Sequence, residues 1–280
     1  MKSIRNARLL RSSAAPRLLR SSAAPRLLRS SAAPRSLRPS VAPRSLRPAA
    51  LKIVSGRLQK DYAANPIKLA NNQIFASLTA DATAHGKVLY LEAEQCNTTA
   101  ALERAGVMPA RFHAVTADSV DFAQICAKRP RLTVSHDEVS AVLESLRFGL
   151  CSAWLDYCSE PYGTGDRSPP RDIARAIALL ARNTTQGHTT ILAVTAAASR
   201  LPPGRIAAIR TTLIANGFAD LAPSARDLSP IPVAPFLAEV VRRAAAASGV
   251  AASEVANVQY KSAGNTGQSM TFIAFRFASK

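Results

Sequence analysis

Short apolar runs alternate with stretches of helical periodicity along most of the chain after residue 86. Residues 88–91 read VLYL, which is typical of a buried parallel strand because the run is short and rich in branched and aromatic side chains. Farther along, apolar residues recur every three or four positions at Val139, Val142, Leu143 and Leu146, as on one face of a helix. The pattern therefore predicts repeated strand–helix units.

Five such units, followed by two strands with a helix before them, indicate an α/β fold. Predicted strands lie at residues 88–91, 111–115, 132–134, 151–155, 189–194, 255–260 and 270–277. Predicted helices begin near residues 97, 118, 136, 172, 203 and 236, whereas residues 51–86 look helical or irregular. Glycines between the last two strands predict a hairpin-like connection. We expect a Rossmann-like three-layer sandwich whose seven-stranded sheet is mostly parallel, with an antiparallel edge strand.

The first 50 residues form a repeat. Residues 8–16 read RLLRSSAAP, and the same nine letters return at 17–25 and 26–34 before two altered copies. A proline ends each full copy and interrupts helix propagation, and nine residues make about two and a half helical turns. Successive copies would therefore turn their arginines to opposite faces, which excludes one long amphipathic helix. We predict a tail at residues 1–50 and a single α/β domain at 51–280.

The formal charge of +18 is concentrated in this tail. Residues 1–50 contain 12 of the 36 Lys and Arg residues and no acid, which leaves +6 for the rest. An acid-free segment rich in Arg, Ser and Ala is typical of an organelle transit peptide, and the arginines favour a mitochondrion over a plastid. The organelle import machinery is then a partner. A low-complexity extension, or a basic arm that contacts nucleic-acid phosphates, is the alternative, with a cytoplasmic or nuclear location.

Several other classes of protein lack support in the sequence. No stretch approaches the ~18 apolar residues of a membrane-spanning helix. The phosphate loop GxxxxGK[ST], the hydrolase motif GxSxG and the dinucleotide motif GxGxxG are absent from the sequence. Neither the four cysteines nor the four histidines have metal-ligand spacing, so no metal site is predicted.

Acidic residues follow four successive predicted strands. They are Glu92 with Glu94, Asp118, Asp137 and Asp156. Ligands of open α/β sheets bind at the carboxyl ends of the strands, so these side chains are candidates for a binding site.

Helix capping is the alternative explanation for some of these acids. Asp is a favoured N-cap residue, and both Asp118 and Asp137 directly precede predicted helices. Asp156 fits that explanation less well, because the next predicted helix begins some 15 residues later. Tyr157, beside it, is suited either to stacking on a flat ligand or to packing at the strand end.

Three segments together resemble a class I S-adenosylmethionine-dependent methyltransferase. They read KVLYLEAEQCNTTAALERAG (87–106), TVSHDEVSAVLESL (133–146) and CSAWLDYC (151–158). The resemblance spans roughly residues 84–280 and rests on topology and spacing. It implies S-adenosylmethionine as the cofactor, held by residues from the first three strand ends: Glu92, Glu94, Asn97, Asp118 and Asp137.

The same resemblance implies catalytic roles for Asp156 and Tyr157. The LDYC segment is faintly similar to the Asp-Pro-Pro-Tyr motif of nucleic-acid amino-methylases. The resemblance therefore favours an amino group of a base in RNA or DNA as the acceptor, over a protein or a small molecule. Asp156 would accept a hydrogen bond from the attacking nitrogen, and Tyr157 would stack on the base. Because the cofactor's methyl group is already activated, the protein mainly supplies positioning.

One departure from the family supports a second hypothesis. The family's first motif contains glycines that let the backbone approach the cofactor, whereas residues 92–97 contain none. The alternative is therefore a catalytically inactive methyltransferase-like fold that serves as a binding or assembly subunit. Binding of the cofactor distinguishes the two hypotheses.

Deleting residues 1–50 should leave the melting temperature unchanged, because the repeat is predicted to lie outside the fold. Differential scanning calorimetry of the full chain and the truncated chain tests this expectation. A large drop in melting temperature would show that the tail packs on the domain.

Overall fold

The computed structural model describes residues 65–157, 159–163, 168–184, 187–198, 203–222, 232–262 and 267–280. The repeat at residues 1–50 lies outside these ranges, so the predictions made for it remain predictions. Within the described residues, no helix combines the length and apolar character needed to cross a membrane.

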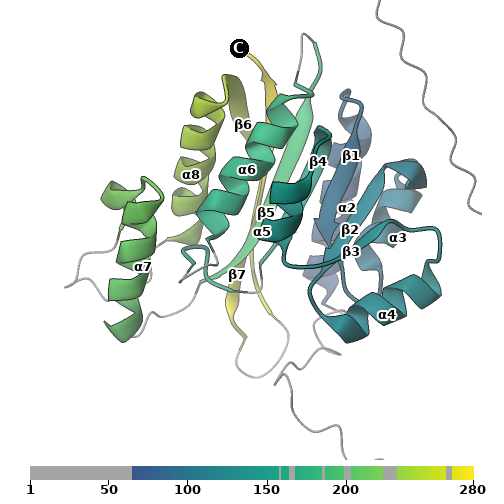
Figure 1. Ribbon diagram of the computed structural model, residues 1–280, viewed down its shortest axis with the longest axis horizontal. Coiled ribbons are helices and arrows are strands. Elements are labelled where there is room, and N and C mark those ends of the chain that lie inside the picture. The colour runs from purple at the N-terminus through teal and green to yellow at the C-terminus, as the bar shows by residue number, and fades with distance from the viewer. Residues whose placement is uncertain are drawn as a thin grey trace, which may run out of the picture. The chain divides into compact units, whose positions relative to one another are not determined.

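A seven-stranded sheet with the order β3-β2-β1-β4-β5-β7-β6 forms the centre of the fold (Figure 1). The strands are β1 (Lys87–Leu91), β2 (Phe112–Thr116), β3 (Val134–His136), β4 (Leu150–Asp156), β5 (Thr190–Ala198), β6 (Val250–Lys261) and β7 (Ser269–Ser279). The first five pair in parallel. β7 runs antiparallel to β5, and β6 at the edge runs antiparallel to β7. The predicted α/β sandwich, with its mostly parallel sheet and antiparallel pairing at one edge, is confirmed.

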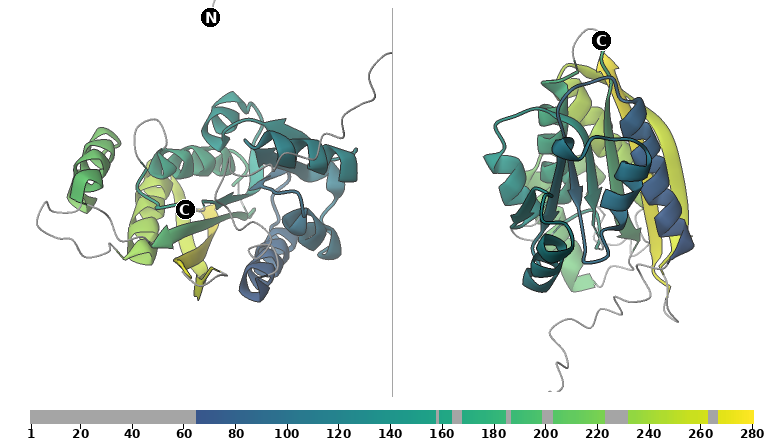
Figure 2. Two further views of the ribbon diagram at one scale, coloured as in Figure 1. Left: turned by 90° about the horizontal axis from the view of Figure 1, so that it is seen from below. Right: turned by 90° about the vertical axis from the view of Figure 1, so that its right-hand side faces the viewer.

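Helices cover both faces of the sheet (Figures 1 and 2). α2 (Pro66–Asp81) and α3 (Asn97–Arg104) pack on one face, against Tyr90 and Trp154. The opposite face carries α5 (Val139–Ser145), α6 (Pro169–Ala181) and α8 (Val233–Ala247), with α7 (Pro203–Ala215) contributing to the same core. α4 (Ser119–Lys128) connects β2 to β3. The two cores exist because successive side chains of a strand point to opposite faces.

α2 is a well-capped helix in the segment that the sequence pattern left open. The Asn65 side chain accepts hydrogen bonds from the backbone N–H groups of Ile67 (2.9 Å) and Lys68 (3.3 Å). Pro66 occupies the first helical position, where its missing N–H is not needed. The Asn65-Pro66 pair is therefore the start of a helix.

Other boundaries moved for local reasons. The helix expected from His136 begins only at Val139, because His136 still pairs with Thr116 in the parallel ladder. α6 begins at Pro169, before the predicted start, since prolines are tolerated in the first turn. β6 begins at Val250, because its pairing with β7 continues to Ser279.

Two glycines at the amino ends of β1 and β4 make room for a polar side chain. A Cβ atom on Gly86 would lie 2.4 Å from the Asn183 amide nitrogen, and one on Gly149 would lie 2.5 Å from its amide oxygen. The Asn183 amide donates to the carbonyl of His85 at 2.7 Å. The turn after α6 is thereby fastened to the bottom of the central strands.

Replacing Phe75 with alanine should lower the free energy of unfolding by about 3–5 kcal/mol. Phe75 is fully buried, and its ring centroid lies 5.3 Å from that of Trp154. Urea denaturation measures the change, with Gln73→Ala on the exposed side of the same helix as the matched control. A cost below about 1 kcal/mol would show that α2 does not stabilise the fold through this contact.

Candidate functional site

The strand order reverses between β1 and β4, whose carboxyl ends lie at the same edge of the sheet. The two strands pair in parallel, with Tyr90 opposite Trp154. Glu92 follows β1 directly and Asp156 is the last residue of β4. The carboxyl ends of β2 and β3 lie at the same edge. There the backbone N–H of Asp137, directly after β3, donates to the carbonyl of Thr116, the last residue of β2, at 3.1 Å. The predicted acids therefore line one edge at a topological switch point, where such sheets bind ligands.

The Glu92 carboxylate caps helix α3. One of its oxygens accepts hydrogen bonds from both the backbone N–H and the hydroxyl of Thr99, each at 2.8 Å. Burial raises the pKa of Glu92, although these hydrogen bonds act in the opposite direction. The positive end of the helix dipole thus already has a carboxylate of the chain itself as its partner.

The turn between β1 and α3 keeps a glycine-like backbone without a glycine. Cys96, directly before α3, has φ 54°, in the left-handed region, and its side chain is only 3% exposed. For residues other than glycine this conformation costs about 1–2 kcal/mol. Because the thiol is buried, it does not project from the carboxyl edge of the sheet.

Contacts to α4 hold the same turn from the other side. The Glu94 N–H donates to the Asp121 carboxylate at 3.3 Å, and the Lys128 ammonium donates to the Glu94 carbonyl at 2.6 Å. The Glu94 carboxylate accepts from the Gln95 amide at 2.8 Å. Asn97 is the first residue of α3 and is half-buried. Hydrogen bonds within the turn and to α4 therefore hold residues 92–96 in place, so these residues do not form an open loop.

Asp118 and Asp137 differ in their local roles. The Asp118 carboxylate caps α4 by accepting from the N–H groups of Val120 (2.8 Å) and Asp121 (3.1 Å), as the capping explanation predicts. Asp137 does not cap α5, since Glu138 occupies the N-cap position and the Asp137 carboxylate accepts from the Glu138 N–H at 2.8 Å. Both aspartates are exposed, so hydroxyl donors of a ligand can reach them.

Asp156 forms an ion pair with a residue that the sequence analysis did not single out. One carboxylate oxygen lies 2.8 Å from the ammonium of Lys68 on α2, and the two side chains are 12% and 19% exposed, respectively. The other oxygen, Oδ1, is buried and has no hydrogen-bond partner among the described residues. The helix-start signal at Asn65-Pro66 would have located α2, but the sequence contains no local signal for its contact with β4.

Tyr157 lies on the other face of the sheet from this ion pair. Its hydroxyl donates to the Asp172 carboxylate on α6 at 3.0 Å, and its ring packs against the core beneath α6. Burial raises the pKa of Asp172 to about 6, although the Tyr157 hydrogen bond lowers it in part. The side chains of Tyr157 and Asp156 therefore do not lie together, although the two residues are adjacent in sequence. The position of Tyr157 matches the packing alternative. Cys158 lies outside the described residues.

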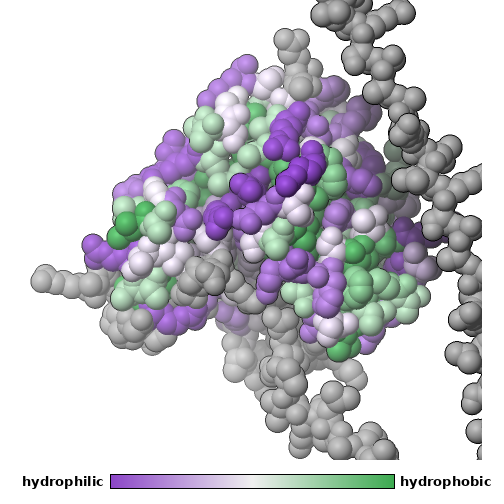
Figure 3. Space-filling view, in the orientation of Figure 1, coloured by the Kyte–Doolittle hydropathy of each residue, from purple (hydrophilic) through white to green (hydrophobic). Residues whose placement is uncertain are grey.

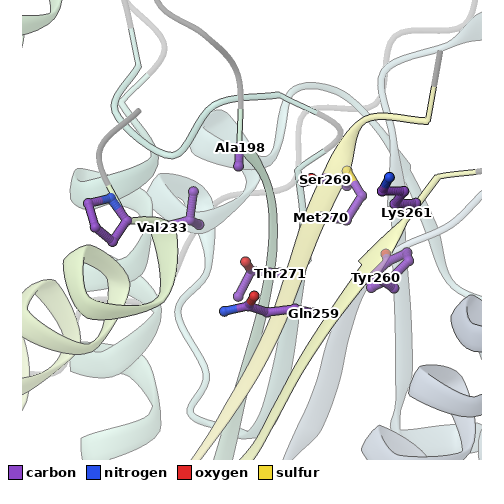
Figure 4. A pocket seen from close by; sticks show the side chains of 9 residues that line it. Ala198, Val233, Gln259, Tyr260, Lys261, Ser269, Met270 and Thr271 are labelled. Atoms are coloured by element: carbon purple, nitrogen blue, oxygen red, sulfur yellow. The ribbon is translucent and has the colours of Figure 1, made fainter. Parts of the chain in front are cut away.

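A cleft of about 470 Å³ opens at the same edge, beside the ends of β5, β6 and β7 (Figure 4). Its lining residues are Ala198, Pro232, Val233, Gln259, Tyr260, Lys261, Ser269, Met270 and Thr271. The Lys261 carbonyl accepts a hydrogen bond from the Asn65 amide at 3.1 Å, so the cleft adjoins the start of α2. Its lining combines amide, hydroxyl and apolar groups with the ammonium of Lys261.

The described residues include no group of three or more His, Cys, Asp and Glu side chains that could hold a metal ion.

On the face shown in Figure 3, hydrophilic residues run over α6, where Arg171 and Arg175 are exposed. Arg171 forms an ion pair with Glu144 at 2.5 Å.

No protein-family model matches the sequence, and no curated protein matches it. Among solved structures, the chain resembles the N-methyltransferase NodS of Bradyrhizobium japonicum bound to S-adenosylhomocysteine, with 14% identity, coverage of 76% of this chain and 88% of that chain, and a TM-score of 0.42. It also resembles the 1,6-didemethyltoxoflavin-N1-methyltransferase of Burkholderia thailandensis, with 14% identity, coverage of 79% and 82%, and a TM-score of 0.47. An O-methyltransferase from Bacillus cereus gives 12% identity, coverage of 76% and 82%, and a TM-score of 0.39. At these values, the function has to be inferred from the residues of this chain.

Replacing Asp172 with asparagine should stabilise the protein at neutral pH. A folded-state pKa of about 6, raised from 3.8, means that the folded state binds the proton more tightly than the unfolded state. The stabilisation of the folded state by the protonated Asp172 carboxyl is then fully present below about pH 4 and is lost as the pH rises through about 6. Asp172→Asn should flatten this decline and raise the free energy of unfolding at pH 7.5 by up to about 3 kcal/mol.

Urea denaturation at pH 4.5, 6 and 7.5 measures the effect. Asp137→Asn, at an exposed carboxylate, is the matched control. A loss of stability at pH 7.5 in Asp172→Asn would contradict the expectation and show that the ionised carboxylate stabilises the fold.

Proposed function

We propose that the protein is an S-adenosylmethionine-dependent methyltransferase that acts on an amino group, with a base of RNA or DNA as the favoured acceptor. The observation that carries the proposal is Asp156 at the end of β4, beside the switch point. One of its oxygens is bound by Lys68, and the other is buried without a partner among the residues that the structure describes. A hydrogen-bond acceptor in this position suits a nitrogen that attacks a methyl group.

The chain's own residues support binding of this cofactor at the ends of β1, β2 and β3. Exposed carboxylates at Asp118 and Asp137 can accept hydrogen bonds from the hydroxyl and amino groups of a nucleoside. Glu94 and Asn97 lie at the β1–α3 turn, where they can contact the charged end of the cofactor. Cys96 keeps the glycine-like turn with its side chain buried. When bound, the cofactor supplies an activated methyl group.

Asp156 would position the acceptor rather than attack anything itself. A neutral amine attacks with its lone pair, so its N–H groups must point away from the methyl carbon. An N–H donated to Oδ1 of Asp156 fixes that orientation, and orientation is a large part of what a protein contributes to such a transfer. Oδ1 is also the atom that can receive the proton released by the alkylated nitrogen.

A specific observation favours the second candidate function, a non-catalytic binding or assembly subunit. Glu92 already caps α3, and Asp121 and Lys128 already bind the backbone of Glu94. A turn that satisfies its own polar groups in this way offers fewer of them to a cofactor. The fold would then be retained for its surfaces.

For the tail, a mitochondrial transit peptide remains our proposal. Its support is the acid-free composition rich in Arg, Ser and Ala at residues 1–50. Import would place the domain near organelle RNA and DNA, which is consistent with a nucleic-acid acceptor.

Titration of S-adenosylmethionine and S-adenosylhomocysteine into the full chain by calorimetry tests the proposed function. We expect micromolar binding, weakened about tenfold or more in Asp118→Asn and Asp137→Asn because each change removes a charge-assisted hydrogen bond. Asp81→Asn, at the exposed end of α2, should bind like the unaltered chain. Asp156→Ala should retain cofactor affinity and lose methyl transfer.

Absence of binding at millimolar cofactor, in a sample that is folded by circular dichroism, would contradict the enzyme proposal and favour the non-catalytic subunit. Undiminished transfer by Asp156→Ala would remove that residue from the reaction.

A further inference from the structure

The inner face of α2 brings a group of polar residues over the end of β4. Lys68, Asn71 and Phe75 follow one another at intervals of three and four positions, so they lie along the same side of the helix. Lys68 contacts Asp156 at the last residue of the strand, whereas Phe75 packs on Trp154, two residues deeper. Asn71 therefore lies between the ion pair and the aromatic pair.

Asn71 is 1% exposed, yet neither its amide nitrogen nor its amide oxygen has a hydrogen-bond partner among the described residues. The adjacent Asn72 shows the usual arrangement of a buried amide. It donates to the Lys68 carbonyl at 3.1 Å and accepts from the Thr98 hydroxyl at 2.9 Å. An unmet hydrogen bond at a buried polar group costs about 1–3 kcal/mol. Such groups are rare in folded proteins and are often explained by function or by a bound molecule.

Together with Oδ1 of Asp156, the Asn71 amide gives two acceptors and one NH₂ donor near the end of β4 that are buried and have no partner within the described part of the chain. We propose that the inner face of α2 completes the acceptor site, with Lys68 as a positioning residue for Asp156 and Asn71 as a binding residue for the acceptor. This inference rests on the proposed function and adds the residues that select the substrate.

The chemistry of these atoms defines the acceptor. The Lys68 ammonium balances the charge of Asp156 and occupies Oδ2, so Oδ1 remains for an N–H group of a neutral molecule. The Asn71 amide supplies one further donor and one further acceptor. The complementary ligand is a planar group with an amino nitrogen next to a ring nitrogen, as on the edges of cytosine and adenine. Asn and Asp side chains recognise these edges in nucleic-acid complexes.

The test uses the full chain and a matched pair of nucleosides, cytidine and N4,N4-dimethylcytidine. They share the ring, but the second has no amino N–H. Binding is followed by NMR chemical shifts with and without saturating S-adenosylhomocysteine. We expect cytidine to bind at least tenfold more tightly than its dimethyl analogue.

Two amide-to-leucine substitutions on α2 locate the interaction. Asn71→Leu should weaken cytidine binding at least tenfold, while its melting temperature stays the same or rises because an unpartnered amide has been removed. Gln73→Leu, on the exposed side of the helix, should change neither quantity. The combination of lost binding with retained stability is not expected of an amide that serves only the fold.

Lys68 is tested by loss and rescue of cytidine binding. Lys68→Met should weaken cytidine binding at least tenfold, because Oδ2 of Asp156 then lacks the ion-pair partner that holds the carboxylate in place. Lys68→Arg should bind cytidine like the unaltered chain, because it restores the positive charge, and all three proteins should bind S-adenosylhomocysteine alike.

The inference is overturned if cytidine and its dimethyl analogue bind equally or neither binds, or if Asn71→Leu binds cytidine normally. It is equally overturned if Lys68→Met binds cytidine as tightly as the unaltered chain, or if Lys68→Arg does not restore the binding. Binding of S-adenosylhomocysteine in the same samples distinguishes a failure of the proposed methyltransferase function from a failure of the proposed acceptor site. Its absence counts against the methyltransferase, whereas its presence without a nucleoside response counts against the acceptor site alone.

Discussion

The parallel pairing of β1 with β4 is the constraint on which the site depends. Crossovers between parallel strands are right-handed. Since the chain continues from β1 and from β4 toward opposite ends of the sheet, the helices that follow these two strands lie on opposite faces. The loops after β1 and β4 consequently separate at the carboxyl edge, which is where open α/β sheets bind ligands. Glu92 and Asp156 stand at that divide, and α2 closes over it from one face.

Most of the acids at this edge serve local structure. Helix N-termini attract carboxylates, and strand ends in this fold lead directly into helices. Glu92 and Asp118 are consumed largely as caps, whereas Asp156 has no helix to cap and instead meets a lysine from a distant part of the chain. The capping geometry thus separates the acids that stabilise helices from the acid that can act on a ligand.

Local patterns predicted the parts of the fold that depend on neighbours in sequence. The strands, the Asp118 cap and the antiparallel pairing of the last strands follow from apolar runs and turn residues that lie close together. The pairing of Asp156 with Lys68 and that of Tyr157 with Asp172 could not be predicted, because each joins segments whose approach is decided by the packing of a whole helix. The buried amide of Asn71, which has no partner among the described residues, could not be predicted either, because a polar residue on a helix is ordinarily exposed.

The glycine-free turn at residues 92–97 looks different once Cys96 is seen in its left-handed conformation. The backbone has a shape that glycine adopts without strain, although the residue is a cysteine. A cysteine codon becomes a glycine codon by a single base substitution, in either direction. The turn therefore lies one mutational step from the residue that its own conformation favours.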